Sequence, residues 1–136
     1  MKNYGVGASA NYYADLALDK KGEWLDGGKN YRLPVPPNVP ARNFWSVTAY
    51  DLESASYIRD TPKSSVDSNQ AELKANSDGS VDIYFGPKAP EGKEGNWIPT
   101  KKGQRFFMLF RFYGATPAAY DGSYKLNDIE RVEYPF

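Results

Sequence analysis

One arginine stands out because of the residues that share its side of a predicted strand. Two-residue alternation places Arg111 on one face with Phe107, Leu109 and Tyr113. A guanidinium in apolar surroundings needs a partner, because an unpaired buried charge is costly. Its planar fork of donors fits a carboxylate or a phosphate, which predicts ligand binding. The alternatives are a structural salt bridge to an acid such as Asp51, or a stem packed on rings with its head in water.

Aromatic side chains form the second candidate group, with 11 Tyr, 7 Phe and 3 Trp. Flat rings with polar tips suit sugars and aromatic ligands, but they also fill protein cores. We expect Trp45 in the core, whereas core and pocket are equally open for Trp97. Asn96 either caps a turn or hydrogen-bonds a ligand. The predicted ligand-binding residues are Tyr31, Trp45, Tyr50, Asp51, Asn96, Trp97, Arg111 and Tyr113.

Two groups of acidic residues suggest catalysis or metal binding. Asp51 and Glu53 point the same way in an extended chain, and paired carboxylates can divide acid and base roles in glycoside hydrolysis. A solvated pair is the simpler interpretation. Asn76, Asp78 and Asp82 surround a turn, but their spacing does not match an EF-hand loop and the distal Glu is missing. We therefore expect no metal and no cofactor.

Composition excludes several classes of function. The chain has no cysteine and no histidine, which excludes a Ser-His-Asp triad, an imidazole base and His-ligated zinc. Its formal net charge is +0, so we expect no nucleic-acid partner. No apolar run approaches the ~18 residues of a membrane helix, so we expect no membrane insertion. The sequence assigns no compartment.

Strand patterns recur along the chain, whereas helical periodicity is weak. Strands are predicted at 44–50, 73–75, 81–85, 105–113 and 129–132, and a hairpin is predicted to join 24–25 to 31–33. Prolines 34 to 40 predict an extended crossing segment outside any ladder. Residues 51–70 are predicted to be mostly loop, residues 86–96 a surface loop, and residues 117–120 one helical turn. Both faces of 105–113 are largely apolar, so we expect a central strand covered on both sides.

These elements predict an all-β fold. Roughly seven or eight short strands with turn-rich connections are typical of an antiparallel β-sandwich. We expect a jelly-roll arrangement with long Pro/Gly-rich loops and at most one or two short helical turns. The 136 residues fit one domain, residues 1–136, with residues 1–11 as an irregular N-terminal extension.

Five groups of short strings, taken in order, resemble one bacterial module. They are Leu25-Asp26-Gly27 with Asn30-Tyr31, Phe44-Trp45-Ser46 with Tyr50-Asp51, Asp78-Gly79-Ser80 with Tyr84, Asn96-Trp97 with Pro99, and Arg111 with Tyr113-Gly114. Over residues 12–134 they resemble the domain-of-unknown-function family 1214. The resemblance implies a jelly-roll β-sandwich without a settled activity. It also implies a place behind a domain of family 1254, as the C-terminal half of a longer protein.

Three functions stay open, in this order. The first is a noncatalytic module that packs against a partner domain or a second copy of itself. The second is a small-molecule or saccharide site in a concave pocket, with Arg111 at its floor and Tyr50, Trp97 and Tyr113 around it. The third is a carboxylate-based hydrolase that uses Asp51.

Overall fold

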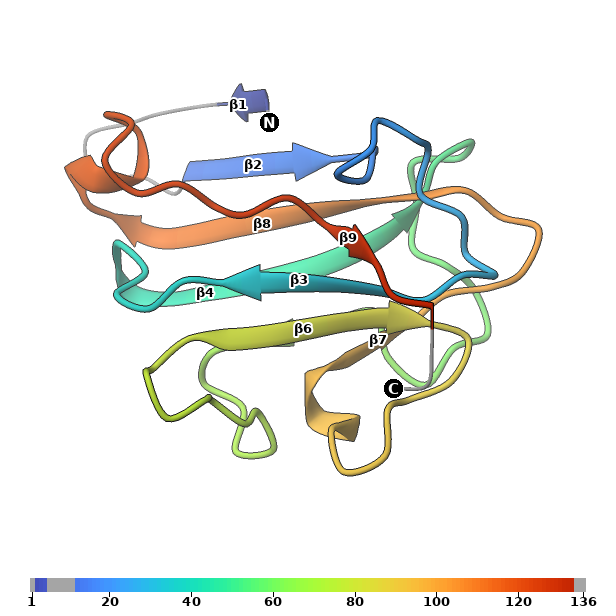
Figure 1. Cartoon of the computed structure of the whole chain (residues 1–136). Helices are drawn as coiled ribbons and strands as arrows, with labels where there is room; N and C mark the ends of the chain where they lie inside the picture. The colour runs from blue at the N-terminus through green and yellow to red at the C-terminus, as the bar shows by residue number, and fades with distance from the viewer. Residues whose placement is uncertain (1, 5–11, 134–136) are drawn as a thin grey trace.

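The computed structural model describes residues 2–4 and 12–133, and within these ranges nine strands form two sheets (Figure 1). One sheet has the strand order β1 (Lys2–Tyr4), β2 (Tyr12–Leu16), β8 (Phe106–Ala115), β4 (Ala41–Asp51) and β5 (Ser65–Asp67). The other has the order β7 (Trp97–Pro99), β6 (Val81–Gly86), β3 (Tyr31–Val35) and β9 (Glu130–Arg131). Neighbouring strands are antiparallel except β6 and β7, which are parallel. Single 3₁₀ turns occupy Glu94–Asn96 and Pro117–Ala119.

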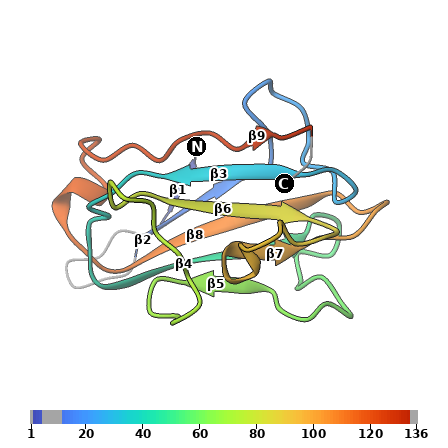
Figure 2. The same cartoon turned by 60° about the horizontal axis from the view of Figure 1, so that its bottom comes forward.

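The two sheets lie face to face as a sandwich, which confirms the predicted all-β class (Figure 2). The core forms from the inward side chains of both sheets, because alternate residues of a strand point to the same face. The five-stranded sheet contributes Tyr12, Trp45, Val47, Ala49, Phe106, Met108, Phe110 and Phe112, and the four-stranded sheet contributes Tyr31, Leu33, Val35, Val81, Ile83, Phe85 and Ile98. The jelly-roll connectivity stays a prediction.

Strand β8 has the central position that its sequence predicted, since it lies between β2 and β4. One face of β8 is fully buried, from Phe106 to Phe112. The opposite face, which carries Arg111, is only half-buried. The expectation that β8 is covered on both sides is therefore wrong, because the chain packs its second sheet against one face alone. This uncovered face holds the first candidate site.

Partner choice between strands is where the sequence predictions are wrong. The hairpin across Asp26 does not form, because β3 pairs with β6 and β9 instead. Pro34 lies inside β3 and not in a ladder-free segment. Its carbonyl faces away from β6 and accepts a hydrogen bond from Asn127 Nδ2 at 3.0 Å, so its missing N–H costs no ladder bond.

Among the local predictions, some are confirmed and others are wrong. Residues 73–75 do not form the predicted strand, although 81–86 does. The predicted loop 51–70 contains the short strand β5, which pairs with β4. The predicted helical turn after β8 and the last short strand are confirmed at Pro117–Ala119 and Glu130–Arg131. Within the predicted N-terminal extension, Lys2–Tyr4 forms β1, and the rest of that extension lies outside the described residues. None of the helical segments in the described part is long and apolar enough to cross a bilayer.

Candidate functional site

The outer face of the five-stranded sheet carries stacked rings around Arg111. We call its half-buried residues on β4 and β8, together with exposed Tyr57, the aromatic face. These are Phe44, Tyr50, Tyr57, Phe107, Leu109, Arg111 and Tyr113. At one end Phe44 stacks on Tyr113, with ring centroids 4.2 Å apart. At the other end Tyr50 stacks on Phe107 at 5.2 Å and on Tyr57 at 5.3 Å.

The side chain of Arg111 runs along the sheet between these two ring clusters. Its backbone pairs with Ser46, yet its Nη2 donates to the hydroxyl of Tyr50 at 2.8 Å. Tyr50 pairs with Phe107, four residues earlier in β8, so the arginine stem must lie parallel to the strand. A longer contact of 3.4 Å joins Nη1 to Thr48 Oγ1, and the guanidinium carbon is 6.0 Å from the Tyr50 ring centroid. The buried hydroxyls of β4 thus lie beneath the cation.

The partners of Arg111 are therefore hydroxyls. Among the residues that the structure describes, no carboxylate forms an ion pair with it. The salt bridge to Asp51 does not form, because Oδ2 of Asp51 accepts hydrogen bonds from the backbone N–H and hydroxyl of Ser54, at 2.9 and 2.7 Å. Of the two structural alternatives, the observed arrangement is closer to an arginine stem packed on aromatic rings than to a salt bridge with Asp51.

Two of the predicted site residues are part of the core. Trp45 is 7% exposed and stacks on Phe110 with centroids 5.3 Å apart. Tyr31 is 2% exposed, and its hydroxyl accepts a hydrogen bond from the backbone N–H of Asp26 at 2.9 Å. Both side chains fill the space between the sheets and do not reach the aromatic face.

Asn96 and Trp97 belong to the other sheet, so the structure does not bring them together with Arg111. Asn96 is 1% exposed, and its amide bonds both backbone groups of Lys74 and the carbonyl of Asp82. Trp97 lies on edge strand β7, and its indole N–H donates to the Gly86 carbonyl at 2.9 Å. Of the eight predicted residues, Trp45, Tyr50 and Asp51 lie on β4 and Arg111 and Tyr113 on β8, with Trp45 directed into the core.

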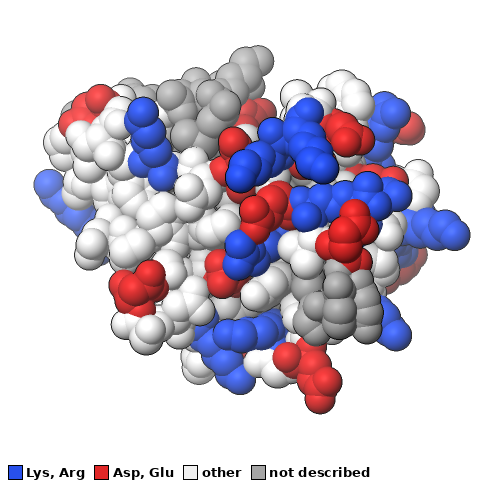
Figure 3. Space-filling view, in the orientation of Figure 1, with Lys and Arg blue, Asp and Glu red and all other residues white. Residues whose placement is uncertain are grey.

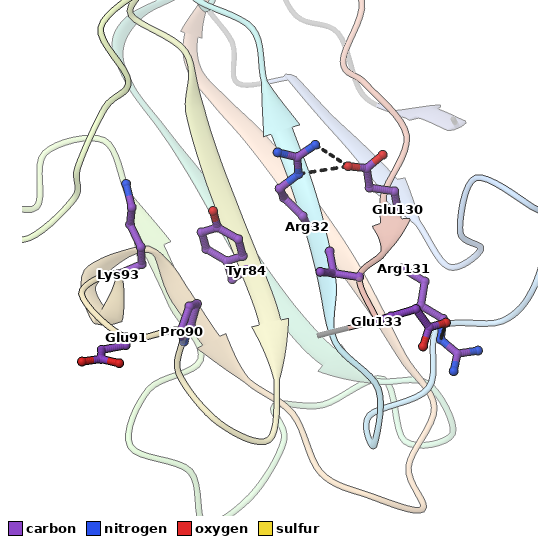
Figure 4. Close-up of a pocket in the computed structure, with 9 residues that line it drawn as sticks. Arg32, Tyr84, Pro90, Glu91, Lys93, Glu130, Arg131 and Glu133 are labelled. Carbon is purple, nitrogen blue, oxygen red and sulfur yellow. Dashed lines mark hydrogen bonds and ion pairs between the residues drawn. The ribbon is translucent and has the colours of Figure 1, made fainter. Parts of the chain in front are cut away.

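A hollow of about 690 Å³ lies on the four-stranded sheet and includes none of the eight predicted ligand-binding residues (Figure 4). Arg32 of β3 and Glu130 of β9 form one side, where Nε and Nη2 of the arginine donate to Glu130 Oε1. Tyr84 of β6 lies between this pair and Lys93, which projects from the loop before β7. Alternation placed Tyr84 on this face, but the pairing of β3 with β9 joins segments that no local pattern connects.

The charges of this hollow compensate one another. The hydrogen bond to Glu130 raises the pKa of Arg32, and Asp82 lies 4.0 Å from its Nη1. Burial raises the pKa of the Tyr84 phenol, and the negative charge of Asp82 adds to the shift. Positive and negative side chains lie side by side across this face of the molecule (Figure 3). Such a surface is typical of a solvated, ion-paired sheet face.

Neither acidic group acquires the geometry of a catalytic or metal site. Asp51 caps a turn, and Glu53 is exposed. Asp78 Oδ1 accepts hydrogen bonds from the N–H and hydroxyl of Ser80 at 2.9 and 2.6 Å, which lowers the pKa of this carboxyl. Within the described ranges, His, Cys, Asp and Glu form no group of three or more that would hold a metal ion.

Comparison with known proteins agrees with the resemblance found in the strings of the sequence. A family model described as "Protein of unknown function (DUF1214)" matches residues 10–117. The VPA0106 protein of Vibrio parahaemolyticus has 28% sequence identity and a TM-score of 0.79, and the match covers 96% of this chain and 32% of that one. A putative uncharacterized protein of Burkholderia cenocepacia, 18% identical, shares the fold with a TM-score of 0.53 over 96% of this chain and 31% of that one.

The chain thus spans about a third of the length of these solved proteins. No curated protein matches it. The family match extends over most of the sequence and includes all five groups of strings. The chain therefore belongs to the family of proteins of unknown function DUF1214.

Proposed function

We propose that this chain is a noncatalytic β-sandwich module whose aromatic face packs against another folded domain. The observation that carries the proposal is the composition of the outer face of β4 and β8. From residue 44 to 50 and from 107 to 113, its outward side chains include rings, Leu109 and Arg111 but no Lys, Asp or Glu. The flanking strands add carboxylates on either side of this strip, since Asp15 of β2 pairs with Leu109 and Asp67 of β5 pairs with Ser46. Protein interfaces are enriched in aromatic residues and Arg and depleted in Lys, Glu and Asp.

The shape of this face favours a protein over a small molecule. Small ligands bind in concave sites that enclose most of their surface. Arg111 lines none of four hollows formed by described residues, and two of these reach the aromatic face only at Phe44 and at Tyr57. The rings of Phe44 and Tyr113 stack 17° from parallel and those of Tyr50 and Phe107 at 18°, so each pair forms one apolar cluster on the sheet face. A sheet face that carries such ring clusters complements a second apolar protein surface.

The charge of Arg111 favours a different domain over a second copy. A two-fold contact brings the same patch of both copies together, so face-to-face packing around Arg111 would bring two guanidinium groups close. The solved relatives supply a suitable candidate, since most of the VPA0106 chain lies outside its match to this one. A domain of that kind is the partner we propose.

A noncatalytic role agrees with the chemistry of the described side chains. The chain has no His or Cys, so general acid–base work would fall to carboxylates, Lys or Tyr. Asp51 and Asp78 cap their own turns, and Glu130 is paired with Arg32. These carboxylates are committed to structural contacts.

The crystal structure of VPA0106 offers the first test. The sheet face that aligns with Leu109 and Arg111 should be covered by the part of that chain outside the match. A solvent-exposed face at that position would overturn the proposal.

Substitution in the whole VPA0106 protein gives the second test. We expect Glu at the position aligned with Leu109 to lower the midpoint of thermal unfolding by several degrees. A loss of ~1 kcal/mol in the free energy of unfolding shifts this midpoint by roughly 2–4 °C in a larger chain. The same Leu109→Glu change in this chain, where Leu109 is half-exposed, should cost less than ~1 kcal/mol in urea unfolding. An equal loss in both proteins would contradict a covering domain, and a wild-type dimer of this chain through the same face would reassign the partner to a second copy.

A further inference from the structure

We infer that the partner places a carboxylate on Arg111, and that this ion pair fixes the position of the contact. The inference rests on the proposed function, and it specifies the chemistry of the partner at the centre of the aromatic face. Its starting point is that the hydrogen-bond partners of Arg111 among the described residues are the neutral hydroxyls of Tyr50 and Thr48.

Those two hydroxyls orient the guanidinium without compensating its charge. The hydrogen bond to Tyr50 is short, at 2.8 Å, and the contact to Thr48 is longer, at 3.4 Å. A guanidinium has more N–H donors than these two contacts use, and they lie in one plane. An arginine held in this way is prepared for two parallel hydrogen bonds to a carboxylate.

Arg32 on the other sheet shows the contrasting arrangement within the same molecule. Its Nε and Nη2 both donate to Glu130, and Asp82 lies 4.0 Å from Nη1. Arg32 thus obtains its anionic partner from the chain itself. Arg111 is half-buried as well, yet the described part of the chain provides no acid within ion-pair distance.

Docking of another domain on the aromatic face makes an anionic group opposite Arg111 necessary. When another domain covers the aromatic face, water leaves the surroundings of Arg111, and an unpaired guanidinium becomes strongly unfavourable. Asp and Glu are the anionic side chains that a protein domain can place opposite it. The rings on both sides exclude water from the pair, which strengthens it and makes a misplaced partner costly.

The test uses benzoate as a probe that combines a carboxylate with a flat apolar ring, and benzamide as its uncharged counterpart. Binding is followed through the arginine Nε–H signals in NMR spectra of the whole chain. We expect benzoate to shift the Arg111 signal saturably and benzamide to leave it unchanged. The Arg32 signal should not respond, because Glu130 already occupies that fork.

Two variants distinguish benzoate binding by the planar guanidinium from binding to a positive charge alone. Arg111→Lys keeps the charge but loses the planar pair of donors, and we expect benzoate to bind about tenfold more weakly, followed through the backbone amide of residue 111. Tyr50→Phe, which removes the orienting hydroxyl, should weaken binding by a smaller factor.

The inference is wrong if Arg111 does not respond, if Arg111→Lys binds benzoate equally well, or if exposed Arg42 and Arg59 respond as strongly. A negative benzoate result together with a covered face in VPA0106 would remove this inference and leave the packing module intact.

Discussion

Asn96 was a candidate ligand-binding residue, and its surroundings show that it is a structural one. Its amide oxygen accepts from Lys74 N at 2.8 Å, and its amide nitrogen donates to the carbonyls of Lys74 and Asp82 at 2.8 and 2.9 Å. We expect Asn96→Ala to lower the free energy of unfolding by about 2–4 kcal/mol, because buried backbone groups would lose their partners. Urea unfolding measures the loss. Exposed Asn69→Ala should change stability by less than ~0.5 kcal/mol, and equal effects would show that the Asn96 bonds contribute little.

Partly buried tyrosines should make the fold sensitive to alkali. Burial raises the pKa of Tyr12, Tyr31, Tyr84 and Tyr124 above the ordinary tyrosine value of 10.0. The unfolded chain then releases phenol protons that the folded chain retains, so stability is full below about pH 10 and falls as pH rises above it. Lys63, whose pKa burial lowers, acts in the opposite direction but is a single group.

The alkaline effect can be assigned to one residue. Tyr124 donates to the Pro36 carbonyl at 2.7 Å, and Tyr124→Phe should flatten the decline in unfolding free energy above pH 10 by up to ~1.4 kcal/mol per pH unit. Tyr57→Phe is the control, since Tyr57 is 58% exposed. Unfolding free energies that stay constant between roughly pH 9 and 11 in the wild type would contradict this account.

Residue patterns predicted some of the candidate site and not the rest. Alternation placed Arg111 and Tyr113 on one face, because two-residue periodicity is a property of any strand. Trp45 was expected in the core, and it lies there, stacked on Phe110. Alternation could not show that Trp97 lies on the other sheet, since sheet membership depends on contacts between distant segments.

At the scale of elements, the Asp26-Gly27-Gly28 segment illustrates why the predicted hairpin was wrong. Its composition is typical of a hairpin turn, but the segment packs against the loop 101–104 that leads into β8. A Cβ on Gly27 would lie 2.1 Å from the carbonyl oxygen of Lys101 and 2.6 Å from that of Gln104. The glycine is thus required by a close approach between two loops, a reason that local turn statistics do not contain.

The adjacent glycines give a matched test of that close approach. We expect Gly27→Ala to destabilise by about 3 kcal/mol or more, because the backbone of two loops must move apart. Gly28→Ala should cost less than ~1 kcal/mol, since its tightest contact, at 3.2 Å, is with the flexible Lys102 side chain, and Lys102 Cα and Asp26 Oδ1 lie at ordinary contact distances of 3.4 and 3.5 Å. Thermal unfolding of both variants measures the difference. Similar midpoints would show that the 101–104 loop yields easily and does not hold β8 in place.

At the scale of the whole molecule, the outer faces of the two sheets expose different kinds of side chain to solvent. The four-stranded sheet covers its outside with compensated ion pairs such as Arg32 with Glu130. The five-stranded sheet carries rings and Arg111 on the outside of β4 and β8, with Asp15 and Asp67 on the flanking strands. A flat apolar face promotes association, and a single charge at its centre opposes contact between two identical faces. We therefore expect Arg111 both to favour an acidic partner and to oppose pairing between copies of the chain.

This dual role predicts that Arg111→Leu increases self-association. The substitution makes the centre of the face apolar, and a chain with formal net charge +0 has no overall repulsion to oppose pairing. We expect the wild type to remain monomeric in light scattering at concentrations where Arg111→Leu forms dimers or larger species. Arg59→Leu is the matched control, because it removes the same charge and adds the same apolar side chain at an exposed position outside β4 and β8. Self-association of both variants to the same extent would assign the effect to lost charge alone, and monomers in every case would show that the aromatic face is too small to pair.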